Sequence, residues 1–262
     1  MIDGQTIGAD ALLRTDLASS KKLVLFDIDG TLVRLGAFKS RYDVAAKDVL
    51  GMEIPAGVID QLLSEGKVDR GIALALVGIA NVTKEKTEET LSFLYDSQRR
   101  FVADKLSKVG LDALQGAAEL LTALSGRDDI IIGTVTANTK DIAFIKLAGA
   151  GLGGFFTNSM ASAFGDMAED KAGLFRNAIA SAESALGQKL DRRNIFYVAD
   201  QPSDVKMGQS VGIRTIAVSS SGVPAAELAK ANPDAVLPSL ADIGAVVSII
   251  EGRGILHDKR KC

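Results

Sequence analysis

The chain has 262 residues, of which 47% are hydrophobic and 24% charged, and its formal net charge is −3 at pH 7. This composition is typical of a globular protein of one large or two modest domains, and the slightly acidic balance provides no basic field for phosphate backbones, so nucleic acid is not expected as a partner. The only His (His257) and the only Cys (Cys262) stand in a polar C-terminal tail, which argues against internal disulfides, Cys- or His-rich metal sites and His- or Cys-based catalysis.

Residues 1–22 carry three aspartates and no unbroken apolar segment, so they are not expected to act as a secretory signal. No apolar stretch is long enough to span a bilayer, and we expect no membrane association. A single cysteine fits a reducing compartment, and the sequence therefore predicts a cytoplasmic protein.

Short apolar runs that end in polar residues predict buried parallel strands over residues 23–26, 130–135, 195–199 and 215–218. Helical patterns between these runs cover residues 139–147, 171–186 and 203–211. Strand and helix alternate, which predicts an α/β fold with a doubly wound, mostly parallel sheet and a Rossmann-like core. Ligands of such sheets bind at the carboxyl ends of the strands.

The segment from residue 32 to about residue 113 contains no convincing strand, and its apolar residues recur at helical spacing. We therefore predict an inserted all-α cap domain over residues 33–114 and a catalytic core over residues 1–32 and 115–262. Glycines stand in both connections between the two parts, where they would permit hinge motion.

The sharpest motif is Asp27-Ile28-Asp29-Gly30-Thr31, directly after the first strand. On an extended backbone, positions two apart face the same side, so Asp27 and Asp29 would address one ligand. Two crowded carboxylates repel each other unless they share a cation or one of them is protonated. The alternative is a plain Asp-Gly turn with a solvated Asp27.

Five more polar residues follow later strands or begin helices, and all would lie at the same edge of the sheet: Thr136, Asn138, Lys171, Asp200 and Asp204. Each has a simpler explanation when it is taken alone. Thr136 and Asn138 would cap a helix, Lys171 would form a surface ion pair with a neighbouring acid, and the two aspartates would be a cap and a surface acid. Their common location instead favours a site for an anion and a hard cation.

The run from Gly149 to Gly154 satisfies the pattern G-x-G-x-x-G of dinucleotide-binding proteins. That fingerprint works only between a strand and a following helix. Here the glycines follow a helical stretch and precede residues 155–157, which we predict to be a strand. The run is therefore interpreted as a helix end and a tight turn.

Taken together, the Asp27–Thr31 motif, the strand end at Thr136, Lys171 and the Asp200–Asp204 segment resemble the four motifs of the haloacid dehalogenase-like hydrolase superfamily, and the helical insertion looks like the cap of its phosphoglycolate-phosphatase-like members. The resemblance implies that Asp27 is the nucleophile and Asp29 the general acid–base, and that Thr136 and Lys171 bind the phosphoryl group. It also implies Mg²⁺ held by Asp27, the main-chain carbonyl of Asp29, and Asp200, with Asp204 in support.

The chemistry that follows is hydrolysis of a small phosphomonoester through an aspartyl-phosphate intermediate. Asp29 would protonate the leaving alcohol, so we expect Asp29 to be protonated while Asp27 is charged. The alternatives are a phosphomutase of the β-phosphoglucomutase type and a ligand-binding module without catalysis.

The expected partner is a small phosphorylated metabolite, and the chain is expected to be a monomer or a homodimer. Asn138 and Arg34 are candidates for substrate binding, and Lys39 and Arg41 are in reach of the same place. For the three basic residues, solvated positions at the start of a surface helix are an equally good interpretation.

Overall fold

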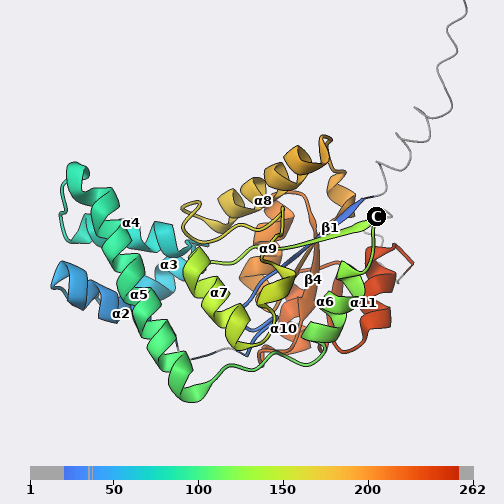
Figure 1. The fold of residues 1–262 in the computed structure, drawn as a ribbon, viewed down its shortest axis with the longest axis horizontal. Helices are drawn as coiled ribbons and strands as arrows, with labels where there is room; N and C mark the ends of the chain where they lie inside the picture. The colour runs from blue at the N-terminus through green and yellow to red at the C-terminus, as the bar shows by residue number, and fades with distance from the viewer. Residues whose placement is uncertain (1–20, 35, 37, 254–262) are drawn as a thin grey trace, which may run out of the picture.

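The structure is a computed structural model that describes residues 21–34, 36 and 38–253 (Figure 1). Within these residues one parallel five-stranded sheet has the order β2-β1-β3-β4-β5. The strands are β1 (Lys22–Phe26), β2 (Ile130–Thr134), β3 (Ile195–Ala199), β4 (Arg214–Val218) and β5 (Ala235–Leu237). From β1 the chain adds β2 on one side and then β3 to β5 on the other, which confirms the predicted doubly wound sheet. The predictions for residues 1–20 and for His257 and Cys262 lie outside the described residues.

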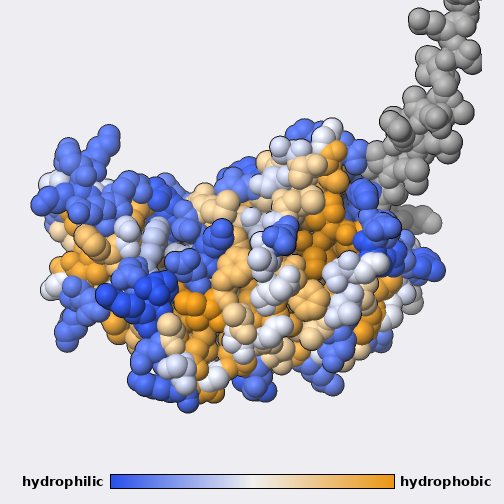
Figure 2. All heavy atoms as spheres, in the orientation of Figure 1, coloured by the Kyte–Doolittle hydropathy of each residue, from blue (hydrophilic) through white to orange (hydrophobic). Residues whose placement is uncertain are grey.

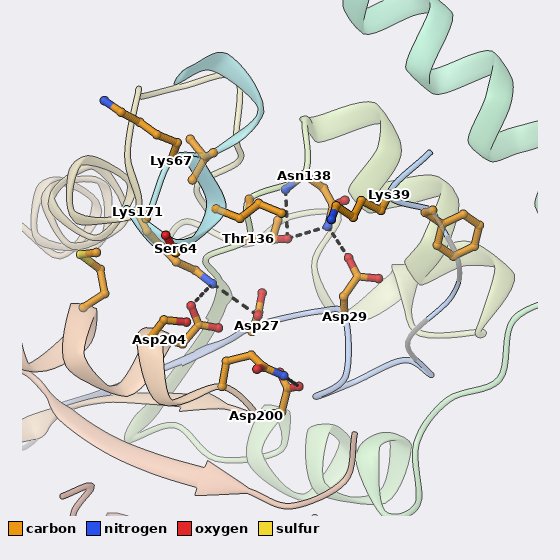
Figure 3. A pocket seen from close by; sticks show the side chains of 18 of the residues that line it. Asp27, Asp29, Lys39, Ser64, Lys67, Thr136, Asn138, Lys171, Asp200 and Asp204 are labelled. Atoms are coloured by element: carbon orange, nitrogen blue, oxygen red, sulfur yellow. Dashed lines mark hydrogen bonds and ion pairs between the residues drawn. The ribbon is translucent and has the colours of Figure 1, made fainter. Parts of the chain in front are cut away.

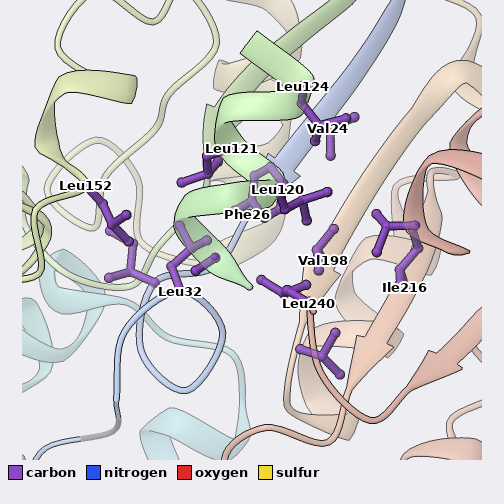
Figure 4. Packing of buried hydrophobic residues seen from close by; sticks show 14 of the residues in the cluster. Val24, Phe26, Leu32, Leu120, Leu121, Leu124, Leu152, Val198, Ile216 and Leu240 are labelled. Carbon is purple, nitrogen blue, oxygen red and sulfur yellow. The ribbon is translucent and has the colours of Figure 1, made fainter. Parts of the chain in front are cut away.

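Helices cover both faces of the sheet (Figure 1). On one face, α6 (Ala117–Ser125), α7 (Lys140–Gly149) and α11 (Ile243–Ile250) pack against alternate residues of the strands, such as Val24 and Val198 (Figure 4). On the other face lie α8 (Lys171–Leu186), α9 (Pro202–Ser210) and α10 (Ala225–Lys230). The strands are buried on both faces, and this is why they appear in the sequence as unbroken apolar runs.

Between β1 and α6 the described residues form no strand, only isolated bridges and helices: α2 (Arg41–Ala45) with a π-helical continuation (Ala46–Leu50), α3 (Val58–Ser64), α4 (Asp69–Ile79), a 3₁₀ turn (Lys84–Lys86) and the long α5 (Thr87–Val109). These helices have apolar clusters of their own, as expected for an inserted helical unit. The connections to the core are paired, since Arg34 N–H donates to Asp112 O and Leu114 N–H donates to Leu32 O, both at 2.9 Å. The domain limits at residues 32/33 and 114/115 stay a prediction.

Two departures from the sequence analysis have physical reasons. Residues 155–157 are not a strand: a 3₁₀ turn (Gly153–Phe155) follows α7, and Phe156 inserts into the core beside α6 and α7. A short apolar run can thus be buried by packing against the end of a hydrophobic core as well as by pairing in a sheet. The edge strand β5 was not predicted, because its three residues are only half-buried and give no periodic signal.

The outer surface of the helical insertion is mostly hydrophilic in Figure 2, where it forms the lobe opposite the sheet. Isolated apolar side chains such as Phe93 are exposed there, as is common in soluble domains. Across residues 21–34, 36 and 38–253, no helix combines the length and the apolar character needed to cross a bilayer.

Candidate active site

The loop after β1 places two carboxylates at the edge of the sheet. Asp27 continues the strand, because its N–H donates to Val198 O at 3.0 Å, and Asp29 follows where the chain turns away. Gly30 makes this turn with φ +79°, a conformation that favours glycine. A Cβ at Gly30 would also lie 2.4 Å from Asp200 Oδ2, so the glycine lets the loop approach the third carboxylate closely.

Three buried carboxylates converge at this edge: oxygens of Asp27, Asp200 and Asp204 all lie within 4.8 Å of one another (Figure 3). Lys171, the first residue of α8, lies among them, with Nζ 2.8 Å from Asp204 Oδ1 and 3.3 Å from Asp27 Oδ2. Lys171 is only 6% exposed, which rules out the alternative of a surface ion pair. Burial would lower the pKa of Lys171, but the charges of Asp204 and Asp27 raise it above its ordinary value, so the ammonium is retained.

The carboxylate cluster fits a hard divalent cation. Burial raises the pKa of Asp27, and the charges of Asp204 and Asp200 add to this increase, while Lys171 opposes it. Burial also raises the pKa of Asp200, whose oxygens accept hydrogen bonds from Thr31 Oγ1 at 3.3 Å and Gln201 Nε2 at 2.6 Å. Burial and the neighbouring negative charges disfavour the ionised form of these carboxylates, and a shared cation offsets both effects. Carboxylate oxygens are also the ligands that Mg²⁺ prefers. The expectation that the carbonyl of Asp29 also ligates stays a prediction.

A chain of hydrogen bonds links the other predicted residues (Figure 3). Asn138 Nδ2 donates to Thr136 Oγ1 at 2.8 Å and to Asp29 Oδ2 at 2.7 Å. Lys146 of α7 joins this chain, with Nζ 2.6 Å from Asp29 Oδ2 and 2.9 Å from Asn138 Oδ1. Thr136 and Asn138 therefore do more than cap a helix, since N-cap Thr139 lies between them and α7.

The sequence analysis missed Lys146. The residue lies on the inner face of α7 together with Ile142, Ala143 and Leu147, and it is only 1% exposed. A lysine within the apolar stripe of a helix was the signal that could have identified it.

Lys146 also reverses the expected order of the two carboxyl pKa values. Burial would raise the pKa of Asp29, but the charge of Lys146 and hydrogen bonds from Lys146 and Asn138 lower it below its ordinary value. Asp27 is the carboxyl whose pKa is raised. In the protein without bound ligands these two shifts run against the predicted order, because a buried cation outweighs the repulsion between the two acids. The protonation of Asp29 in the reaction stays a prediction.

A cavity of about 610 Å³ opens onto these residues. Its lining includes the predicted site residues except Arg34, together with residues of the helical insertion such as Phe38, Lys39, Arg41 and Lys67. Arg34 is not brought to the cavity: its side chain is 69% exposed and lies 3.6 Å from Asp112. The pairing of the two connections directs Arg34 outward, so nothing in its position favours substrate binding.

Arg41, for which a solvated position was an equal alternative, is buried. Its guanidinium donates to Asp69 Oδ1 and to Tyr42 Oη, both at 2.8 Å. Asp69 in turn accepts from the main-chain N–H of Thr139 at 2.9 Å. A buried ion pair of the insertion is thereby joined to the start of α7 in the core.

The insertion covers the cavity from one side. Main-chain hydrogen bonds dock residues 66–70 on the core: Asp69 N–H to Ala137 O at 3.0 Å, Arg70 N–H to Gly165 O at 2.7 Å, and Lys171 N–H to Gly66 O at 3.0 Å. Each bond ends beside a residue of the site. The cavity is therefore roofed on one side by the insertion, and its volume is in the range of small-molecule sites.

Comparisons with known proteins agree with this arrangement. Residues 170–243 match a family model described as HAD-hydrolase-like. No curated protein sequence matches the chain. Solved structures share its fold. A protein from Haemophilus somnus described as a predicted phosphoglycolate phosphatase is 21% identical, with 87% of this chain and 98% of that chain covered and a TM-score of 0.58.

Two further structures are similarly related. CbbY from Rhodobacter sphaeroides, in complex with phosphate, is 16% identical, with coverage of 86% and 96% and a TM-score of 0.61. The β-phosphoglucomutase of Clostridium difficile is 14% identical, with coverage of 88% and 98% and a TM-score of 0.58. The C-terminal segment of residues 170–243 thus resembles the HAD-hydrolase-like family, and the solved structures share the fold over most of the chain.

Proposed function

We propose that the protein is a Mg²⁺-dependent phosphatase that hydrolyses a small phosphomonoester through an aspartyl-phosphate on Asp27. The observation that carries the proposal is the position of Asp27, which lies 3.3 Å from the Lys171 ammonium, within the carboxylate cluster and on the wall of the roofed cavity. A carboxylate nucleophile, a cation for the phosphoryl oxygens and a second carboxylate for proton transfer are what this reaction needs. The phosphatase and phosphate-bound proteins among the structural neighbours support the same reading.

In the first step an Asp27 oxygen attacks phosphorus and the bond to the leaving alcohol breaks. Lys171 and Thr136 hold the phosphoryl oxygens, and Asp29 gives its proton to the leaving oxygen. Asp27, Asp200 and the main-chain carbonyl of Asp29 would hold Mg²⁺, with Asp204 in support, and the ion would supply positive charge that offsets the phosphoryl oxygens. In the second step Asp29 takes a proton from water, which attacks phosphorus and releases phosphate and free Asp27.

Asp29 must be neutral for the first step, although Lys146 favours its charged form in the ligand-free protein. The negative charge of the bound phosphate favours protonation of a nearby carboxylate. The proton is therefore taken up together with the substrate.

A phosphomutase is the second candidate, favoured by the shared fold of β-phosphoglucomutase and by the roofed cavity. In a mutase the phosphoryl group returns from Asp27 to a second hydroxyl of the sugar, so the site must retain the substrate and exclude water. Isomerisation of a hexose phosphate without net release of phosphate would favour this candidate.

The proposal is tested by phosphate release from sugar phosphates, phosphoglycolate, nucleotides and an aryl phosphate, each with Mg²⁺ and with EDTA. We expect at least one substrate to be hydrolysed, and we expect EDTA to abolish the reaction because the buried carboxylates then repel each other and the substrate. Mg²⁺ should also raise the melting temperature, since it binds the folded state. No release from any substrate, with no isomerisation of hexose phosphates, would leave the non-catalytic module as the explanation.

Asp29→Asn is expected to lower kcat by about 10²- to 10⁴-fold, the usual contribution of a general acid–base. The amide keeps the shape and the acceptor oxygen of the side chain, so binding of the phosphoryl group should change little. Phosphate release measures kcat, and competitive inhibition by inorganic phosphate measures binding. Near-wild-type turnover would contradict the role of Asp29.

A further inference from the structure

Lys146 is a buried cation beside the reacting groups for which neither the family motifs nor the proposed mechanism has a role. It is 1% exposed and it lines the cavity. Its Nζ contacts Asp29 Oδ2 at 2.6 Å and Asn138 Oδ1 at 2.9 Å, and the face of the Phe38 ring lies 4.9 Å away. An ammonium is desolvated at a high free-energy cost, so its position here calls for a specific role.

The two oxygens of Asp29 have different surroundings. Oδ2 accepts from both Lys146 and Asn138, whereas Oδ1 is buried and has no hydrogen-bond partner among the described residues. A buried oxygen without a partner is costly in a folded protein and is common where a ligand completes the bonding. The Asp29 side chain is 23% exposed and lines the cavity, so the carboxylate is within reach of a substrate there, although Oδ1 itself is covered in this structure.

We propose that Lys146 is a positioning residue for the general acid–base: through its contact with Oδ2 it fixes the orientation in which the Asp29 carboxylate meets the leaving oxygen of the substrate. This inference rests on the proposed function. Lys146 is held in place by its helix, α7, in which the neighbouring residues Ile142 and Leu147 are fully buried. Hydrogen bonds to one oxygen restrict the rotation of the carboxylate, which would otherwise move the group out of its reactive orientation.

Asn138 connects Asp29 and Lys146 to Thr136, the proposed phosphoryl-binding residue. Its Nδ2 donates both to Asp29 Oδ2 and to Thr136 Oγ1, while its Oδ1 accepts from Lys146. The hydroxyl that would hold the phosphoryl group and the carboxylate that would protonate the leaving group are thus fixed relative to each other. Lys146 is the charged end of this chain, and its removal frees Asn138 as well as Asp29.

The test compares two substrates in wild type and Lys146→Met: the best alkyl phosphate from the panel, and 4-nitrophenyl phosphate. A nitrophenolate departs without a proton, whereas an alkoxide needs one, so only the alkyl substrate depends on Asp29 in the step that kcat/KM reports. We expect Lys146→Met to lower kcat/KM for the alkyl phosphate by about 10²-fold and for the aryl phosphate by less than about threefold. A residue with a merely structural role would lower both values equally.

Lys108→Met is the matched control, because Lys108 is exposed on α5 and pairs with its helical neighbour Asp104. It should leave both kcat/KM values unchanged. The melting temperature of each variant shows whether it is folded. Equal losses on the two substrates, or no loss on either, would overturn the positioning role.

Crystal structures of wild type and Lys146→Met provide a readout that does not depend on activity. We expect the Asp29 carboxylate to rotate away from Asn138 in the variant. An unchanged Asp29 would overturn the inference even if wild type hydrolyses phosphomonoesters. If wild type hydrolyses none of them, the proposed function fails, and the position of Asp29 in the two structures still decides the inference.

Discussion

Asp27→Asn is expected to lower phosphate release by about 10⁴-fold or more, because an amide oxygen cannot form the acyl phosphate on which both steps depend. The fold should be retained. Asn has the shape of Asp, and its carbonyl oxygen can still accept from Lys171, which lies 3.3 Å from Asp27. Since burial raises the pKa of Asp27, replacing it with a neutral group should make unfolding no easier.

Phosphate release under the conditions of the best wild-type substrate measures the effect of Asp27→Asn. Mass spectrometry after rapid quenching adds a second test, since a phosphoryl group should be found on Asp27 in wild type and be absent from the variant. Asp104→Asn is the control, because Asp104 is exposed on α5. Activity within tenfold of wild type, or a phosphoryl group on another residue, would contradict the role of Asp27.

Lys171→Met is expected to affect both stability and activity. It leaves three carboxylates crowded within 4.8 Å and without a buried counter-charge. Removing one partner of a buried ion pair costs about 3–5 kcal/mol, so the free energy of unfolding in EDTA should fall by about that amount. Activity should fall by about 10²- to 10³-fold, as for other groups that stabilise a transition-state charge.

Mg²⁺ distinguishes this electrostatic explanation from a loss of packing. A bound cation supplies part of the missing charge, so it should restore more stability to Lys171→Met than it adds to wild type. Urea unfolding in EDTA and in Mg²⁺ measures both differences, with Lys108→Met as the control for loss of a lysine. If the variant is destabilised equally in the two conditions, the carboxylates are not the cause.

Much of the fold could be predicted because the core strands are buried on both faces. Burial makes them continuous apolar runs, and each run ends where polar residues begin, so the same pattern located both the sheet and its functional edge. The clustering of Asp27, Asp200 and Asp204 followed from that edge alone. Strand β5 was missed because an edge strand of three half-buried residues lacks this signal.

The contacts that depend on tertiary structure could not be predicted from the sequence. For Arg41 the sequence left open a place near the substrate or a solvated position at the start of a surface helix. Its partner Asp69 lies 28 residues away, and its burial depends on how α2 and α4 pack. Lys146 contacts Asp29, 117 residues away, and this contact lowers the pKa of Asp29. Local patterns identify which residue types lie at an edge, whereas pKa values depend on neighbours brought there by the whole fold.

The paired connections of the helical insertion also bear on how such a protein can change over evolution. The chain leaves the core at Leu32–Arg34 and returns at Asp112–Leu114, where the two segments are joined by hydrogen bonds and by a bridge between Val33 and Ala113. The intervening segment is therefore a closed loop whose ends are held together next to the paired strands β1 and β2. A segment with its ends held together in this way tolerates insertion or exchange without separating the two strands that it interrupts.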